Sequence, residues 1–175
     1  MTTDIIPEHL LTNKDEAQIV SLLARCFTTD FGGRSFFQTR HSWRHVLRQD
    51  RIIAHLAVQL RAVRLGADLV TVAGIADVAT DPDHRGKGHA AMLLRAAIGA
   101  ARLSPAQHVL LFGTAQLYPA SGFRPIANPL TYLDLTGART NSLYRDRPEA
   151  HLQVLDLNDR RWDGAKSLDL LGGLF

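Results

Sequence analysis

The 175-residue chain has one cysteine, Cys26, and lacks long apolar runs, repeats and blocks of basic residues. A single cysteine excludes an intrachain disulfide. No apolar run reaches the ~18 residues that a membrane-spanning helix needs. The first residues, Met1 to Pro7, carry the acidic Asp4 and no apolar core of the kind that a signal peptide has. We therefore expect a soluble, cytoplasmic protein.

The net charge is only +3, with 20 Lys and Arg against 17 Asp and Glu, and the basic residues are spread along the chain. A nucleic-acid-binding domain would concentrate them on one face or helix. A small ligand rich in phosphate accounts for the same mild excess. The length is that of one compact domain, which we expect to span residues 1–175.

The histidines do not form a metal-binding pattern. His41 and His45 have i, i+4 spacing, but Ser42-Trp43-Arg44 between them lacks the glutamate of an H-E-x-x-H zinc motif. We expect no metal site, and we interpret both histidines as surface or packing residues.

The periodicity of apolar residues alternates between helical and strand-like segments. An N-cap at Thr12 begins one amphipathic helix, and a second long helix follows the strand-rich centre of the chain. The expected helices cover 13–27, 35–42, 87–103 and 118–122, and the expected strands 43–48, 51–65, 69–80, 108–113, 130–135 and 152–157. This order predicts an α/β fold, a mixed sheet with helices on both faces.

The segment Arg85 to Ala90 lies between a strand and a helix and is suited to binding an anion. The first turn of a helix leaves four N–H groups unpaired, and the helix dipole adds partial positive charge there. Gly86 and Gly88 lack the β-carbons that would keep a pyrophosphate away from the backbone, while Arg85 and Lys87 add charge. The loop is neither a P-loop nor a dinucleotide fingerprint. On its own it also fits a capped helix start with flexible glycines.

Two motifs resemble the GNAT superfamily of acyl-CoA N-acyltransferases. Arg85 to Ala90 fits its [Q/R]-x-x-G-x-[G/A] signature, and Val78-x-Thr80-x-Pro82 before it is similar to the strand end that leads into that loop. Further on, Leu117 to Phe123 is similar to the L-Y-x-x-x-G-F segment. The resemblance implies a GNAT fold, in which two central parallel strands splay apart, here 69–80 and 108–113.

The resemblance also implies acetyl-CoA as cosubstrate, with its pantetheine arm in the splay and its pyrophosphate on the loop. The residues implied in binding it are Val78, Ala79, Thr80, Arg85, Gly86, Lys87, Gly88, His89 and Ala90. The tyrosine of the second motif, Tyr118, lies beside the thioester sulfur in such enzymes and would protonate the leaving thiolate. Packing beside Phe123 is the alternative role for Tyr118.

A base must take a proton from the acceptor amine before or during its attack on the thioester. Asp77 lies on the strand that would carry the thioester, and a carboxylate inside a strand is unusual. We predict Asp77 as this base, with a solvated or salt-bridged strand aspartate as the alternative. The resembling families carry an acid nearby, at a position that aligns with Ala76.

Asp30-Phe31 and the tail from Asp159 to Phe175 resemble the aminoglycoside 2'-N-acetyltransferases and the rhizobial nodulation N-acyltransferases. The segment Thr114 to Leu117 is shorter than in those families. We predict that Asp30 and Phe175, the latter through a terminal carboxylate, bind a cationic acceptor.

The sequence thus predicts an acetyltransferase that moves an acetyl group from acetyl-CoA to the primary amine of a small molecule, aminoglycoside-like or other. The transfer would be by direct attack in a ternary complex. The alternatives are a protein N-terminal or lysine acetyltransferase and a non-catalytic CoA-binding module. The sequence leaves open whether the chain forms a homodimer.

Overall fold

The computed structural model describes residues 2–175. The helices are η1 (Glu8–Leu10), α1 (Asn13–Cys26), η2 (Pro82–His84), α2 (His89–Arg102) and α3 (Leu117–Ala120), where η marks a 3-10 helix. The strands are β1 (Thr2–Pro7), β2 (Trp43–Arg48), β3 (Ile52–Leu65), β4 (Asp68–Thr80), β5 (His108–Phe112), β6 (Arg124–Pro125), β7 (Leu130–Leu133), β8 (Leu143–Arg147), β9 (Leu152–Asp156) and β10 (Leu168–Asp169).

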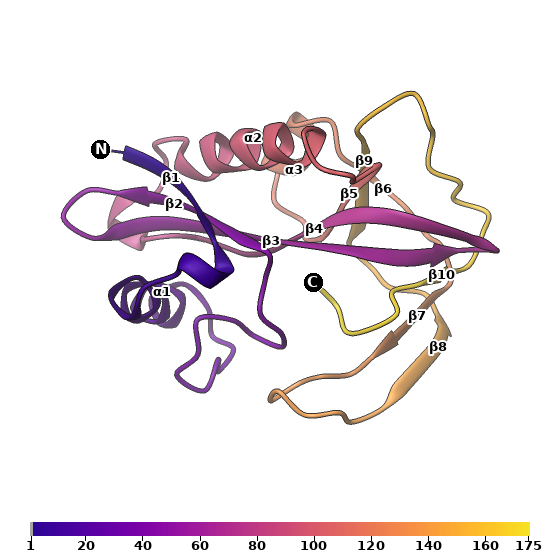
Figure 1. The fold of residues 1–175 in the computed structure, drawn as a ribbon, viewed down its shortest axis with the longest axis horizontal. Helices are drawn as coiled ribbons and strands as arrows, with labels where there is room; N and C mark the ends of the chain where they lie inside the picture. Colours follow the sequence, from indigo (N-terminus) through magenta and orange to yellow (C-terminus); the bar gives the residue numbers. More distant parts are fainter. Residues whose placement is uncertain (1) are drawn as a thin grey trace.

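The described strands form one mixed sheet in the order β6-β9-β5-β4-β3-β10-β7-β8, and β2 and β1 extend it from the first half of β3 (Figure 1). The long antiparallel pair β3–β4 is its centre, and β5 runs parallel to β4. The parallel pairing requires a crossover, which α2 supplies. The predicted α/β fold with a mixed sheet is confirmed.

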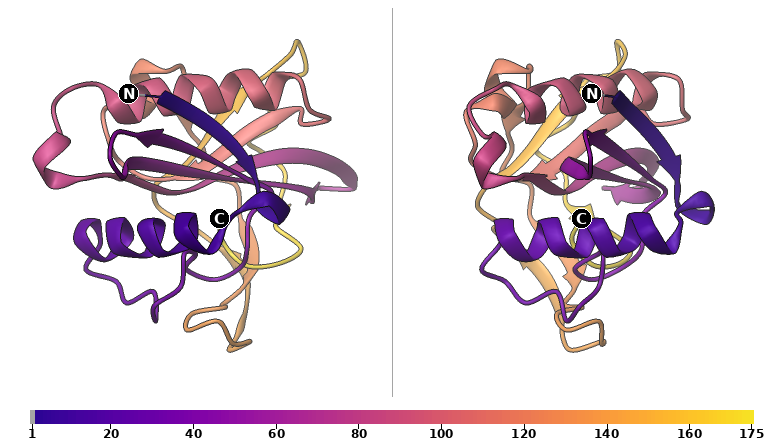
Figure 2. Two further views of the ribbon diagram at one scale, coloured as in Figure 1. Left: turned by 60° about the vertical axis from the view of Figure 1, so that its left-hand side comes forward. Right: turned by 90° about the vertical axis from the view of Figure 1, so that its left-hand side faces the viewer.

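The two long helices cover opposite faces of this sheet (Figures 1 and 2). Helix α1 begins at a capping box between Thr12 and Asp15 and buries Ile19, Leu22 and Leu23 on one face. Helix α2 packs its apolar side against the other face, where its buried residues join the largest core cluster: Leu93, Leu94, Ala97 and Ala101. The chain ends near the middle of the molecule, on the face opposite α2.

The prediction of a helix over 35–42 is wrong, because this segment is a loop. Tertiary contacts decide its conformation: Arg44 Nη1 donates to the Ser35 carbonyl at 2.7 Å, Ser35 Oγ donates to Glu16 at 3.2 Å, and the Phe37 ring packs 5.4 Å from that of Phe31. The strands β1 and β8 were not predicted. Both carry charged residues and pair along one edge only, so their alternation of apolar and polar residues is weak.

Strands β4 and β5 pair only from Val72–His108 to Ile75–Leu111, and the later part of β4 continues without β5. On its other side β4 carries a bulge, where the register with β3 shifts between His55 and Ala57. Asp77 lies in this bulge with φ of +48°. The parallel pairing therefore ends after Ile75, between the two strands for which the resemblance implied a splay.

None of the helices within residues 2–175 combines the length and apolarity needed to cross a membrane.

Candidate active site

The segment Arg85–Ala90, called the phosphate loop below, joins β4 and η2 to the start of α2. Gly86 and Gly88 have φ of +75° and +77°, in the left-handed region that favours glycine, and a β-carbon at either would meet no atom within 4 Å. The first helical bond of α2 runs from Met92 N–H to the Gly88 carbonyl at 3.0 Å. Within the described chain the N–H groups of residues 86–90 have no hydrogen-bond acceptor.

The loop is fixed from behind by Asp81, a carboxylate that is almost fully buried. Arg25 Nη1 donates to its Oδ2 at 2.6 Å, Arg51 Nη2 to the same atom at 3.0 Å, and the Asp83 N–H to Oδ1 at 3.0 Å. Burial acts to raise the pKa of Asp81, but the bonds from Arg51 and Asp83 and the charge of Arg25 lower it overall. Asp81 therefore stays ionised and holds the turn that presents the loop.

A cavity of about 250 Å³ lies where β4 and β5 separate, and we call it the splay cavity. Its walls come from β4, β5, α3, the loop after α1 and the end of the chain: Phe27, Thr29, Phe31, Phe37, Ile75, Ala76, Asp77, Val78, Phe112, Tyr118 and Phe175. The structure thus brings together Asp77, Val78, Tyr118 and Phe175. Aromatic rings dominate the lining, and Asp77 is its one charged side chain.

Tyr118 is buried beside Gly113 at the end of β5. A β-carbon at Gly113 would lie 2.6 Å from the tyrosine ring, so only glycine permits this approach. The ring also meets Phe123 edge-on with centroids 6.1 Å apart, the packing role named as the alternative. Burial raises the pKa of Tyr118, and within residues 2–175 its hydroxyl has no hydrogen-bond partner. The hydroxyl is therefore protonated, and Tyr118 is one of the residues that line the splay cavity.

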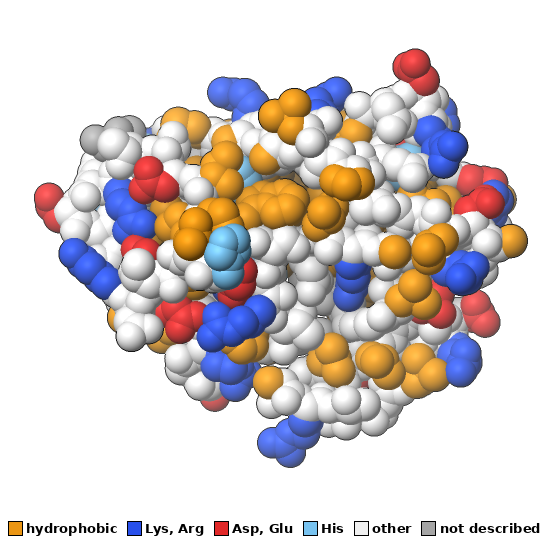
Figure 3. All heavy atoms as spheres, in the orientation of Figure 1, with side chains coloured by type: hydrophobic (Ala, Val, Ile, Leu, Met, Phe, Trp, Pro, Cys, Tyr) orange, Lys and Arg blue, Asp and Glu red, His pale blue; other side chains and the backbone are white. Residues whose placement is uncertain are grey.

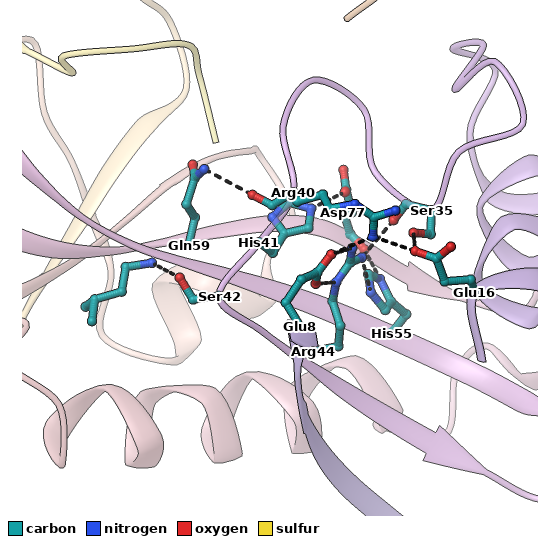
Figure 4. A network of polar contacts seen from close by, with 11 residues as sticks. Glu8, Glu16, Ser35, Arg40, His41, Ser42, Arg44, His55, Gln59 and Asp77 are labelled. Carbon is teal, nitrogen blue, oxygen red and sulfur yellow. Dashed lines mark hydrogen bonds and ion pairs between the residues drawn. The ribbon is translucent and has the colours of Figure 1, made fainter. Parts of the chain in front are cut away.

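Asp77 is held by hydrogen bonds to both its side chain and its backbone (Figure 4). His41 Nε2 lies 2.9 Å from Asp77 Oδ2, and His55 Nδ1 lies 2.8 Å from the Asp77 carbonyl oxygen. Burial lowers the pKa of His55 to about 3, so His55 is neutral. Its Nδ1–H therefore donates to the Asp77 carbonyl, and its Nε2 accepts from Arg44 Nη1 at 3.2 Å.

The fully buried Arg44 extends this network to the N-terminal part of the chain. Its Nε and Nη2 donate to the two carboxylate oxygens of Glu8 at 2.8 and 3.1 Å. The strained bulge at Asp77 thus rests on a buried chain of bonds from Glu8 through Arg44 and His55 (Figure 4).

Sequence reasoning missed this network. His45 is a packing residue as predicted, buried and accepting from Trp43 Nε1 at 3.1 Å, but His41 is the direct partner of Asp77. The spacing of His41 and His45 carried no such signal, since the partner lies 36 residues away. Among residues 2–175 no group of three or more His, Cys, Asp and Glu side chains could hold a metal ion.

The two predicted acceptor-binding residues lie in different surroundings. Asp30 is exposed in a turn, where its Oδ1 accepts from Gly32 N–H at 2.6 Å, and it does not line the splay cavity, although Thr29 and Phe31 beside it do. The Phe175 ring lies against Gly74, where a β-carbon would collide with it, and 4.2 Å beneath the Arg61 guanidinium. Burial lowers the pKa of Arg61 to about 10, so it remains cationic over the ring.

Charged side chains of both signs are interspersed over the face drawn in Figure 3, and no basic block stands out there.

The model of the acetyltransferase (GNAT) domain matches residues 9–126, about two-thirds of the chain. No curated protein matches by sequence. Among solved structures, the GNAT family N-acetyltransferase YhbS from Escherichia coli in complex with CoA is 20% identical, with a TM-score of 0.66 over 95% of this chain and 88% of that one. A GNAT family acetyltransferase from Brucella melitensis in complex with acetyl-CoA is 17% identical, with a TM-score of 0.60 over 95% of each chain. At these identities the structural likeness shows the fold.

Proposed function

This chain belongs to the GNAT acetyltransferase family, and from that premise we propose that it moves an acetyl group from acetyl-CoA to the primary amine of a small molecule. The amine attacks the thioester directly while both substrates are bound. One observation carries the proposal: the carboxylate of Asp77 and the free hydroxyl of Tyr118 line one cavity, at the point where β4 and β5 separate.

Acetyl-CoA fits the geometry of β4 and the phosphate loop. The unpaired N–H groups of residues 86–90 and the start of α2 suit the pyrophosphate, with Arg85 and Lys87 adding charge. The backbone of Val78, Ala79 and Thr80 lies beyond the part of β4 that pairs with β5, and its edge on that side suits the amide groups of the pantetheine arm.

The reaction forms a C–N bond and breaks a C–S bond. A lysine-like ammonium has a pKa of about 10.4, so it must lose a proton before its nitrogen can attack. The charge of Asp77 attracts the ammonium group into the cavity. When the C–S bond breaks, the thiolate takes a proton from the Tyr118 hydroxyl, which is protonated at neutral pH because burial raises its pKa.

The splay cavity supports an acceptor with one ammonium group and an apolar body. Its lining has several aromatic rings and one carboxylate side chain, and a cation over an aromatic face is favourable. A polycationic aminoglycoside would favour more acidic residues, and the predicted second acid, Asp30, lies outside the lining. Phe175, the other predicted acceptor residue, contributes its ring.

Release of free CoA thiol from acetyl-CoA tests the proposal, with 2-phenylethylamine, spermidine, kanamycin and a lysine-containing peptide as acceptors. We expect the fastest release with 2-phenylethylamine. Faster release with the peptide would point to a protein acetyltransferase. CoA binding without release for any amine would make the chain a CoA-binding module and end the proposal.

A further inference from the structure

The imidazole of His41 is held by Asp77 in one tautomer. The side chain is 5% exposed, and its Nε2 lies 2.9 Å from Asp77 Oδ2. An ionised carboxylate only accepts hydrogen bonds, so Nε2 carries the hydrogen of a neutral imidazole and Nδ1 carries the lone pair. A carboxylate that accepts a hydrogen bond from one ring nitrogen of a histidine leaves the other ring nitrogen able to act as a base.

The free nitrogen of this imidazole is one of two buried, unpaired acceptor atoms on residues that line the same cavity. Neither His41 Nδ1 nor Gln38 Oε1 has a hydrogen-bond partner anywhere in residues 2–175. Both residues line a cavity of about 10 Å³, called the small cavity below, which is the size of one water molecule. A water there can donate one hydrogen to each acceptor. The nearby Gln59 amide already donates to Thr39 Oγ1 and the Arg40 carbonyl.

The small cavity adjoins the splay cavity, because Phe37, Asp77 and Phe175 line both. A water beside His41 Nδ1 therefore lies within one side chain of the space where the acceptor amine would be. We propose that His41 Nδ1 receives the proton of the acceptor amine through this water, and that Asp77 orients His41 for this task. The inference rests on the proposed function and assigns the base within it.

The proton transfer balances without any other reactant. The ammonium gives one proton to the water, the water gives one to His41 Nδ1, and the freed nitrogen pair attacks the thioester. When the C–S bond breaks, the nitrogen loses its second proton, which replaces the proton that Tyr118 gives to the thiolate. The imidazolium that results lies against the Asp77 carboxylate. Imidazole is the better acceptor, since model imidazoles are more basic than model carboxylates by roughly 2–3 pKa units.

Four further titratable or charged groups surround His41. Glu8 and Arg44 lie behind it in the buried network, Arg40 precedes it and bonds to Glu8 and Glu16, and His55 is neutral. The Glu8 carboxylate and the Asp77 carboxylate favour the imidazolium, whereas the two arginines oppose it.

The substitution His41→Gln tests the assignment, with acetyl-CoA and 2-phenylethylamine as substrates. The glutamine amide can still donate to Asp77 Oδ2 but cannot accept a proton at neutral pH. We expect kcat to fall by ~10²–10⁴-fold, the range typical for loss of a general base. We also expect the acidic limb of the pH–kcat/KM profile to disappear while CoA affinity is unchanged. The matched control His45→Gln changes a buried histidine without contact to Asp77 and should keep the limb.

Several results would overturn the inference. An acidic limb that survives in His41→Gln, whether kcat falls or not, leaves His41 with a structural role. The ¹⁵N NMR shifts of the His41 ring in the parent protein give an answer that does not depend on whether the variant folds. They should show hydrogen on Nε2 and none on Nδ1 above the acidic limb, and the opposite tautomer refutes the assignment. A parent that releases no thiol with any amine defeats the proposed function itself, whereas an equally active His41→Gln enzyme defeats only this inference.

Discussion

The two sides of the splayed strand are built in different ways. The phosphate loop is one run of six residues, and the groups that we propose bind the pyrophosphate are backbone N–H groups that local conformation leaves unpaired. The acid–base side is assembled from distant segments: His41 before β2, Asp77 in the β4 bulge, Tyr118 on α3 and Phe175 at the other end of the chain. A binding surface made of backbone depends on glycine and on one helix start. A catalytic surface made of side chains depends on the whole fold.

The comparison predicts that the largest single effect comes from a side chain added to the loop. Gly88→Asp places a carboxylate beside the pyrophosphate and forces an L-residue into φ of +77°. Like charges ~4 Å apart repel by about 4 kcal/mol at an effective dielectric of ~20, or about a thousandfold in affinity. Calorimetry of CoA binding measures the loss. Gly99→Asp on the open side of α2 is the control and should bind CoA as the parent does. Parent-like affinity in a folded Gly88→Asp protein would remove the loop from the binding site.

On the acid–base side, a smaller effect is expected from removing the Tyr118 hydroxyl. Tyr118→Phe keeps the ring packed against Phe123 and Gly113. We expect kcat to fall by about 10²-fold, at the lower end of the range for a general acid, with CoA affinity unchanged. Gly88→Asp would then lower the affinity for CoA, whereas Tyr118→Phe would lower turnover. Equal turnover of Tyr118→Phe and the parent leaves the tyrosine with packing alone.

What the sequence could predict follows the same division. The loop Arg85 to Ala90 and the segment Leu117 to Phe123 with Tyr118 could be recognised because each is one contiguous run of residues, while their roles stay predictions. The position of Asp77 on its strand was visible, but its bulge was not, because the bulge depends on His55 and Arg44 across the sheet.

The same limit explains the loop before β2 and the acceptor residues. The helix predicted for residues 35–42 is absent because tertiary hydrogen bonds to Arg44 and Glu16, which local sequence does not reveal, hold this segment as a loop. Local sequence also gave no means of choosing between Asp30, which is in an exposed turn, and its neighbour Phe31, which lines the splay cavity.

A smaller effect on kinetics is expected from Phe175, a residue that would contact the acceptor but take no part in proton transfer. Phe175→Ala removes a ring shared by both cavities and the partner of the Arg61 guanidinium. We expect the KM for 2-phenylethylamine to rise about tenfold, which corresponds to ~1.4 kcal/mol, while the affinity for CoA stays the same. Steady-state kinetics with a fixed, saturating acetyl-CoA concentration measure it. Phe36→Ala is the control, because Phe36 lies outside the lining of either cavity. An unchanged KM would take Phe175 out of the acceptor site.

The smallest expected effect concerns how the bulge is held. Burial lowers the pKa of His55 to about 3, so between that value and its unfolded value of ~6.5 only the unfolded chain takes up the proton. The unfolded state then binds more protons, and the free energy of unfolding falls as the pH decreases. From pH 7 to 5.5 this one histidine lowers it by roughly 1 kcal/mol, as expected for a slope of at most ~1.4 kcal/mol per pH unit. Urea unfolding of the neutral variant His55→Gln at the two pH values should show a pH dependence of the unfolding free energy that is smaller by this amount. His45, whose pKa is lowered to about 4, still contributes its own pH dependence in that variant. An unchanged slope in His55→Gln would mean that His55 is protonated in the folded protein, and the Asp77 carbonyl would then be held by a cation.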